Sequence, residues 1–184
     1  MKRLFDIIIC LVALILLAPA FLLMAVFIAM ESKGGVLFLQ DRAGIGGRPF
    51  KIFKFRTMIP DAENKGPLLA VRGDPRVTGV GSFLRRWSLD ELPQLFNIIK
   101  GDMSLVGPRP EILPIVNGYT PWQRKVLDVK PGLTGFSQAM GRDDLLIETK
   151  LRLDNYYIRR QSFCFDIWSI WKTIIIVLTG RGAF

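Results

Sequence analysis

Residues 85–110 read Arg-Arg-Trp-Ser-Leu-Asp-Glu-Leu-Pro-Gln-Leu-Phe-Asn-Ile-Ile-Lys-Gly-Asp-Met-Ser-Leu-Val-Gly-Pro-Arg-Pro. Two adjacent carboxylates, Asp90 and Glu91, come before a helical pattern of apolar residues that Gly101 ends. Beyond this pattern Arg109 stands between two prolines, which restrict the backbone on both sides of it. Helix N-termini and guanidinium groups both attract phosphate oxygens. The stretch therefore indicates a site that handles phosphate groups.

Pro93 limits where the helix can begin, because proline has no N–H and is tolerated only within the first turn. If Pro93 is the third helical residue, Asp90 is the N-cap. A start at Ser88 would instead form a capping box with Glu91, at the loss of one helical hydrogen bond. Both registers put Asp90 beside the positive end of the helix dipole, which favours its ionised form. The alternative is that the two acids are only a helix cap.

The composition of the 184 residues, half of them hydrophobic, predicts one compact domain with a membrane element. Lys and Arg outnumber Asp and Glu by 25 to 16, which suits nucleic acid, anionic lipid or phosphate-bearing substrates alike. The absence of histidine excludes Ser-His-Asp triads and histidine–metal sites. With only Cys10 and Cys164 present, a cysteine zinc cluster is excluded and a structural disulfide is not expected. Chemistry is left to carboxylates, Lys, Arg, hydroxyls or a metal held by oxygen.

Residues 7–30 form an uncharged apolar run near the amino terminus. As one helix it would be about 36 Å long, enough to cross a bilayer. Pro19 divides the run into halves of about 17 Å, each too short to cross. Basic residues flank both ends, and both flanks therefore favour the cytoplasmic side: Lys2, Arg3, Lys33, Arg42 and Arg48. From the residues alone, a spanning helix and a re-entrant helix remain alternatives.

Two strand-like runs, 36–40 and 50–56, flank a glycine-rich segment and predict an antiparallel hairpin. The second run breaks strict alternation, so we expect a bulge or an edge strand there. Lys54 and Arg56 could be ordinary solvated charges on such an edge. Residues 59–79, rich in Pro, Gly, Asp and Asn, are typical of an exposed loop.

The carboxyl-terminal part alternates helical patterns with breakers. Gly132 and Thr134 lie in Lys-Pro-Gly-Leu-Thr-Gly, which is either a tight turn or a backbone cradle for an anion. Residues 143–161 carry mixed charges at helical spacing. Residues 163–178 combine tryptophans and aliphatic residues but are too short and charged to span a membrane. They predict a helix lying in the headgroup plane or on the soluble core.

The run Ser-Leu-Asp-Glu-Leu-Pro-Gln-Leu at 88–95, then Asn97, then Gly-Asp-Met-Ser-Leu-Val-Gly-Pro-Arg-Pro at 101–110, resembles the bacterial sugar transferase family. These are monotopic phosphoglycosyl transferases that act on polyprenyl phosphate. The resemblance continues through 2–6, 54–58 and 130–135 and covers essentially the whole chain. It implies a helix-rich α/β membrane-associated domain. Residues 1–32 would be a re-entrant helix, and 33–184 a catalytic domain on the cytoplasmic face of the inner membrane. The bend falls at Pro19, preceded by Ala18 where many relatives have serine.

The resemblance implies transfer of a phosphosugar from a UDP-sugar to undecaprenyl phosphate, giving polyprenyl-diphosphate-sugar and UMP, as the first membrane step of glycoconjugate assembly. Asp90 would be the nucleophile of a ping-pong reaction. Glu91 would be a metal ligand or a proton-handling partner, and Mg²⁺ would be held at the two acids. The candidate substrate contacts are Lys54, Arg56, Arg85, Pro108, Arg109, Pro110, Gly132 and Thr134.

Lipid and the two substrates are thus the expected partners, and nucleic acid is not. The alternative is a basic, membrane-anchored binding or scaffold protein without catalysis. The sequence leaves open the sugar, the glycan pathway and the oligomeric state, for which a homodimer is one option.

Overall fold

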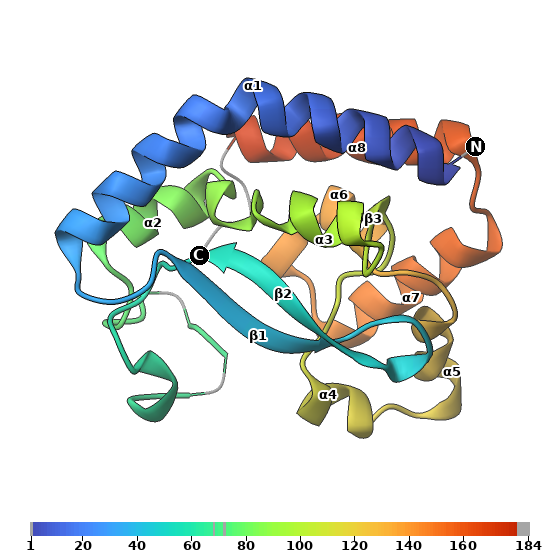
Figure 1. Ribbon diagram of the computed structural model, residues 1–184. Helices are drawn as coiled ribbons and strands as arrows, with labels where there is room; N and C mark the ends of the chain where they lie inside the picture. Colours follow the sequence, from blue (N-terminus) through green and yellow to red (C-terminus); the bar gives the residue numbers. More distant parts are fainter. Residues whose placement is uncertain (1, 68, 72, 180–184) are drawn as a thin grey trace.

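A computed structural model describes residues 2–67, 69–71 and 73–179 and contains twelve named helices and strands within them (Figure 1). In chain order they are α1 (Lys2–Glu31), β1 (Leu37–Ala43), β2 (Pro49–Phe55), α2 (Gly79–Arg86), α3 (Gln94–Lys100), β3 (Ser104–Val106), α4 (Leu113–Asn117), α5 (Pro121–Arg124), β4 (Gly132–Thr134), α6 (Phe136–Met140), α7 (Ile147–Arg159) and α8 (Phe163–Thr179). The predicted helix-rich α/β fold is confirmed. The division into domains at residue 32 stays a prediction.

Helix α1 is continuous, with Pro19 inside it, and it changes direction midway along its length (Figure 1). Proline removes one helical hydrogen bond and crowds the preceding turn, which is the usual cause of such a kink. Among the described residues α1 is the one helix long and apolar enough to cross a membrane, and 11% of its most apolar window is buried. Most side chains of this window are therefore at least partly exposed.

The amino-terminal end of α1 is tied to the domain that follows it. Lys2 Nζ donates to Asp166 Oδ2 at 2.7 Å, to the Tyr157 hydroxyl at 2.9 Å and to the Val106 carbonyl at 3.0 Å. Arg3 donates to the last carbonyls of α3, which are orphaned acceptors at a helix C-terminus. The two basic residues at this end of α1 therefore make structural contacts with the domain.

The other end of α1 is tied to the same domain. The Glu31 carboxylate accepts hydrogen bonds from the Val80 N–H, with both oxygens at 3.1 Å, at the start of α2. Arg56, just after β2, donates to the carbonyls of Ser32 and Lys33 at 2.7 and 2.8 Å. Both ends of the apolar helix thus lie on one body of protein, although 30 helical residues separate them.

The hairpin forms as predicted, with β1 and β2 antiparallel from Leu37↔Phe55 to Ala43↔Pro49. This register is unbroken, so the bulge option is wrong and the edge-strand option is correct, since the sheet has two strands. Asn97 of α3 fixes β2 in place. Its Oδ1 accepts the Phe53 N–H at 2.9 Å, and its Nδ2 donates to the Lys51 carbonyl at 2.7 Å.

The segment predicted as a tight turn at 132–134 is instead a short strand. β4 pairs with β3 in parallel, through Ser104↔Gly132 and Val106↔Thr134. A Cβ on Gly132 would lie 2.1 Å from the Gly107 nitrogen, so the two backbones can approach only because residue 132 is glycine. The prediction of a tight turn was wrong because it did not include the close packing of this segment on Gly107.

Helix α8 lies alongside the amino-terminal half of α1 (Figure 1), and the rings of Phe5 and Phe163 meet edge to face at 5.1 Å. Large apolar side chains remain exposed on both helices, among them Leu16 on α1 and Trp171 on α8. Most described residues of the 59–79 segment are exposed, as predicted. It carries a short 3-10 turn and a buried ion pair between Asp74 and Arg76 at 2.6 Å.

Candidate active site

The two acids lie on a separate 3-10 turn, Leu89–Glu91, and α3 begins only at Gln94, with Pro93 as its N-cap. Both predicted registers are therefore wrong: the Asp90 side chain does not cap α3, and no capping box forms at Ser88. Because Pro93 lacks an N–H, the chain makes i→i+3 bonds through this region, such as Leu92 N–H to the Leu89 carbonyl at 3.2 Å.

Glu91 is the point where two cations meet. Lys54 Nζ lies 2.7 Å from Oε1, and Arg109 donates from Nη2 to Oε1 at 2.8 Å and from Nη1 to Oε2 at 3.3 Å. Burial by itself would raise the pKa of Glu91, but the charges and hydrogen bonds of Arg109 and Lys54 bring that pKa well below its usual range. The two cations therefore favour the ionised form of Glu91.

Asp90 lies in a different environment from its neighbour, with 8% of its surface exposed. Burial raises the pKa of Asp90; Lys54, Arg85 and Arg109 act to lower it, Glu91 acts to raise it, and the net shift is upward. This contradicts the expectation that a helix dipole would favour the ionised form, because no α-helix begins at Asp90. A poorly stabilised carboxylate gains more than a well-solvated one from contact with an electron-poor centre.

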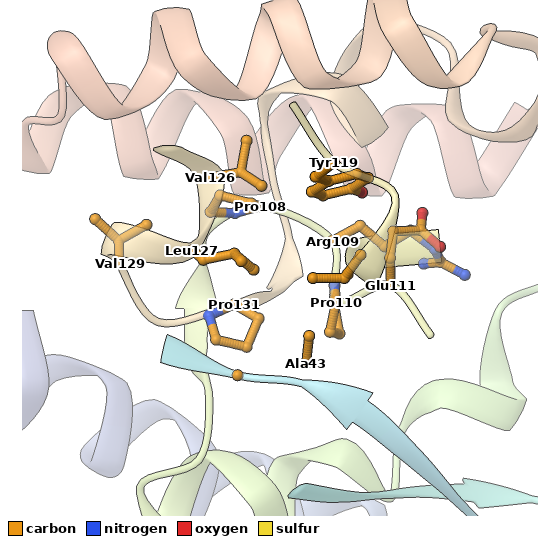
Figure 2. Close-up of a pocket in the computed structure, with 12 residues that line it drawn as sticks. Ala43, Pro108, Arg109, Pro110, Glu111, Tyr119, Val126, Leu127, Val129 and Pro131 are labelled. Carbon is orange, nitrogen blue, oxygen red and sulfur yellow. The ribbon is translucent and has the colours of Figure 1, made fainter. Parts of the chain in front are cut away.

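Hydrogen bonds to the carbonyls of Pro108 and Pro110 hold the backbone on both sides of Arg109. The Pro108 carbonyl accepts the Gly132 N–H at 2.9 Å, and the Pro110 carbonyl accepts Arg42 Nη1 at 3.0 Å. Figure 2 shows the two prolines in a small pocket lined by apolar side chains, among them Val126, Leu127 and Pro131. Its free volume is about 10 Å³, room for one water at most, so the pocket supports the backbone of Arg109 and is too small for a substrate.

Two predicted substrate contacts are used elsewhere. Arg56 hydrogen-bonds to Ser32 and Lys33 at the end of α1, and the structure does not bring it to Glu91. Gly132 donates its N–H to Pro108, so this N–H is not available to an anion. Arg85 does join the site: its Nε donates to the Thr57 hydroxyl at 2.8 Å, and its charge acts on Asp90.

Beside this cluster lies a cavity of about 340 Å³ whose lining is mostly apolar. The apolar lining residues come from several segments: Ile9, Trp87, Leu89, Leu92, Leu105, Leu133, Ile170, Ile174, Val177 and Leu178. Charged and polar residues also line it: Ser88, Glu91, Arg109, Thr134, Ser137, Gln138, Arg142, Lys150 and Thr173. The volume lies in the range of sites for small molecules and cofactors.

Several of these lining residues were missed by the sequence reasoning. Arg142 donates to the Ser88 hydroxyl, and both residues have positive φ, 49° and 54°. Left-handed backbone at non-glycine residues is uncommon and is often found at functional sites. Lys150 of α7 and Gln138 of α6 reach the cavity from segments that carry no recognisable phosphate motif. No spacing in the sequence could indicate them, because folding alone brings them to the cavity that Glu91 also lines.

Within the described residues, no group of three or more His, Cys, Asp or Glu side chains is placed to hold a metal ion. Magnesium in phosphate-handling sites is commonly held by one or two carboxylates together with substrate phosphates. Asp90 and Glu91 offer such oxygens, and Glu91 lines the cavity, although its oxygens already contact Lys54 and Arg109.

Comparison with known proteins places this chain in a family. The model of the bacterial sugar transferase family matches residues 1–180. The chain is 44% identical to UDP-N-acetylgalactosamine-undecaprenyl-phosphate N-acetylgalactosaminephosphotransferase of Aeromonas hydrophila, over 99% of this chain and 44% of that protein. It is 38% identical to the exopolysaccharide production protein ExoY of Sinorhizobium fredii, over 100% of this chain and 88% of that protein.

A third relative is UDP-glucose:undecaprenyl-phosphate glucose-1-phosphate transferase of Escherichia coli, 38% identical over 100% of this chain and 41% of that protein. The chain thus spans less than half the length of two of these relatives and most of the length of the third. Because the match runs through the apolar helix, the acid pair and the Pro-Arg-Pro segment, the chain belongs to the bacterial sugar transferase family.

Proposed function

We propose that this chain transfers a phosphosugar from a UDP-sugar to polyprenyl phosphate, with UMP as the other product. One observation carries the proposal: Lys54 and Arg109 converge on Glu91, next in sequence to the buried Asp90, and Glu91 and Arg109 line a largely apolar cavity. The names of the relatives, which specify UDP-sugars and undecaprenyl phosphate, support the same pair of substrates.

In the first step an Asp90 carboxylate oxygen attacks the sugar-linked phosphorus of the donor. The bond between this phosphorus and the oxygen bridging the two phosphates breaks, and UMP leaves with the electron pair. Arg109, Lys54 and Arg85 compensate the negative charge that develops, and Arg109 needs little reorganisation because its backbone is held on both sides. Splitting the transfer through a covalent intermediate replaces one difficult step by two easier ones.

In the second step a phosphate oxygen of polyprenyl phosphate attacks the same phosphorus, and the bond to Asp90 breaks to regenerate the carboxylate. The lining of the cavity matches this acceptor. The aliphatic side chains of Ile9, Ile170 and Ile174 suit isoprene units, and the cationic lining residues, among them Arg109, suit the phosphate. A lipid acceptor can then react without its tail leaving the membrane.

The contacts of α1 support a re-entrant arrangement of this helix. Lys2 and Arg3 at one end, and Glu31 at the other, bind the same domain. A helix crossing the bilayer would put these ends about 30 Å apart on opposite faces, where one small domain cannot bind both. We therefore propose that α1 enters and leaves the cytoplasmic face of the inner membrane, with its bend at Ala18 and Pro19.

Labelling tests this topology. A tag with one cysteine, placed ahead of residue 1, should resist a membrane-impermeant maleimide in intact cells and react after lysis. Native Cys10 is buried, and Cys164 lies in the domain itself. Pro19→Leu should straighten the helix and expose the tag in part of the population. Labelling of the unaltered chain from outside would contradict the re-entrant arrangement.

We further propose that Mg²⁺ is held by the donor diphosphate together with the carboxylates of Asp90 and Glu91, where it would neutralise phosphate charge. Turnover should then stop in EDTA and return on addition of Mg²⁺. Glu91→Gln should slow turnover and be partly rescued by higher Mg²⁺. Full activity in EDTA would remove the metal from the proposal.

The main experiment mixes the chain, in lipid nanodiscs, with a panel of UDP-sugars. Without acceptor, UMP release should stop at one equivalent or less, and a phosphosugar should be found on Asp90 by mass spectrometry. Polyprenyl phosphate should then discharge the adduct and allow continuous turnover. UMP release that strictly requires the acceptor, with no adduct, would show direct transfer. Release from no donor in the panel, with or without acceptor, would contradict the proposed activity.

A further inference from the structure

Arg42, near the carboxyl end of β1, has its charged group largely buried against the Pro-Arg-Pro segment. Its side chain is 14% exposed, and its Nη1 donates to the Pro110 carbonyl at 3.0 Å. Gln40 lies on the same face of the strand, because alternate residues of a strand share a face. The Gln40 Oε1 accepts Arg42 Nε at 3.0 Å and Nη2 at 2.7 Å. The guanidinium is therefore fixed by Gln40 on one side and joined to Pro110 on the other.

The backbone of β1 is attached to the same segment. The Ala43 N–H donates to the Glu111 carbonyl at 2.9 Å, and Arg42 also forms an ion pair with the Glu111 carboxylate at 3.8 Å. Ala43 and Pro110 line the same small pocket (Figure 2). The end of β1 thus contacts the residues that directly follow Arg109 through both its backbone and its side chains.

The second strand of the hairpin carries the other cation of the site. β1 and β2 are paired in an unbroken register, so Lys54 on β2 has a fixed place relative to Arg42 on β1. Lys54 and Arg109 are the two cations that contact Glu91. One hairpin therefore holds both of them, Lys54 through the chain itself and Arg109 through the contact of Arg42 with Pro110.

A charged side chain is an unfavourable choice for this contact if stability alone matters. Burial and the charge of Arg109 lower the pKa of Arg42, and the carboxylates of Glu111 and Glu91 oppose the shift only in part. A neutral amide could donate to the Pro110 carbonyl without this cost. Arginine differs from an amide in its rigid, planar fork, which reaches separate partners in fixed directions. The contact is therefore of a kind whose geometry matters more than its contribution to stability.

We infer that Arg42 is a positioning residue: through the Pro110 carbonyl it fixes where the Arg109 guanidinium meets a phosphate group of the donor. The inference rests on the proposed function, in which Arg109 compensates phosphate charge. Arg42 is not among the described residues that line the 340 Å³ cavity, so its effect on a substrate passes through Arg109. A displacement of about 1 Å at a reacting group can lower a rate by about 100-fold.

A double-mutant cycle between Arg42 and Arg109 tests the inference, with the dissociation constant for inorganic diphosphate measured by calorimetry on the chain in nanodiscs. Arg109→Lys should weaken binding by about tenfold or more, because the planar fork is lost. Arg42→Lys keeps the charge but loses the fork, and it should weaken binding by about three- to tenfold. The double variant should bind within about twofold of Arg109→Lys alone, since Arg42 then has no fork to position.

Lys51→Met is the matched control. It removes a cation from the same hairpin at an exposed position, and it should leave the dissociation constant within about twofold of the unaltered chain. Circular dichroism checks that each variant is folded. If Arg42→Lys does not fold, Gln40→Met replaces it. That change keeps Arg42 and removes the acceptor that orients its guanidinium, and the same criteria apply.

Losses that multiply in the double variant would show that Arg42 acts independently of Arg109 and would overturn the inference. Unchanged diphosphate binding in a folded Arg42→Lys variant, or in Arg109→Lys, would overturn it as well. Diphosphate binding requires no transfer reaction, so the two proposals fail separately. Multiplying losses together with normal UMP release would remove the inference and leave the proposed function standing. Losses that do not multiply, in a chain that releases no UMP from any donor, would do the reverse.

Discussion

Two buried ionic clusters in this chain have opposite characters. The anchor cluster (Lys2, Tyr157 and Asp166) joins α1 to α7 and α8: Lys2 and the Tyr157 hydroxyl both donate to the Asp166 carboxylate. In the acid cluster (Lys54, Asp90, Glu91 and Arg109) one carboxylate is paired with cations and the other is poorly stabilised. Both cations bind Glu91, whereas burial raises the pKa of Asp90 despite the cations around it.

The difference shows how to separate structural charges from reactive ones. In the anchor cluster the cation, the hydroxyl and the carboxylate satisfy one another, and such a network serves to hold elements together. In the acid cluster a carboxylate is buried at a cost that its neighbours do not repay, which is typical of functional sites. The predictions below test this contrast, beginning with the largest effect.

Asp90→Asn should lower turnover by about a thousandfold or more, because the amide keeps the shape of the side chain but is not a nucleophile. The melting temperature should stay the same or rise, since a buried carboxylate with a raised pKa is replaced by a neutral group. UMP release and thermal unfolding in nanodiscs measure the two effects. A strong loss of stability would place Asp90 among the structural charges.

Lys2→Met should have the opposite profile, with a loss of about 2 kcal/mol of stability and nearly normal turnover per folded molecule. The estimate is modest because the side chain of Lys2 is 32% exposed, whereas that of Asp166, left without its cation, is only 7% exposed. Chemical denaturation measures the change. The matched control is Lys51→Met, which breaks the exposed pair with Asp41 and should cost less than about 1 kcal/mol.

Arg109→Lys should reduce turnover by about tenfold or more while leaving the fold intact. Lysine keeps the charge but loses the planar group that contacts both Glu91 oxygens and could hold two phosphate oxygens. Steady-state UMP release measures the loss. Wild-type turnover in this variant would mean that charge alone matters at this position.

Asp154→Asn should have the smallest effect, a change in how stability depends on pH. Burial raises the pKa of Asp154 to about 7, well above the ordinary value of 3.8, although hydrogen bonds from Ser137 and the Arg109 backbone oppose the shift. The folded chain thus keeps a proton that the unfolded chain loses. This stabilisation is full below about pH 4 and is lost as the pH rises through 7.

Melting temperatures from pH 4 to 8 should therefore fall less steeply in Asp154→Asn than in the unaltered chain. Asp41→Asn, at an exposed position, serves as the control and should leave the slope unchanged. Parallel curves for all three proteins would show that Asp154 is ionised throughout this range.

Much of the fold follows from local physics that a sequence displays. The uncharged run predicted α1, the glycine-rich segment predicted the hairpin, and Gly101 ends α3 with a positive φ of 101°. The structure likewise brings the Pro-Arg-Pro segment to the acid pair, through the contact of Arg109 with Glu91. Hydropathy, backbone restriction and cap chemistry are properties of a few adjacent residues, so they need no knowledge of distant contacts.

The register at Asp90 could not be predicted in the same way. The sequence offered two ways to start an α-helix, but Pro93 and the left-handed backbone of Ser88 produce a 3-10 turn instead. That conformation is maintained by contacts from β2 and from the segment after β3, which bring Lys54 and Arg109 to Glu91. Tertiary contacts of this kind outweigh small differences in helix-start preference.

Lys54 and Arg56 show which features the sequence determined and which only the tertiary structure determined. The sequence by itself determined that a basic strand, an acid pair and a held arginine are present, because residue type and backbone restriction are local. The resemblance to the sugar transferase family implied that both cations contact the substrate. Only the tertiary structure separated them. β2 ends at Phe55, so Lys54 is held against Glu91, and Arg56, beyond the strand, binds the end of α1.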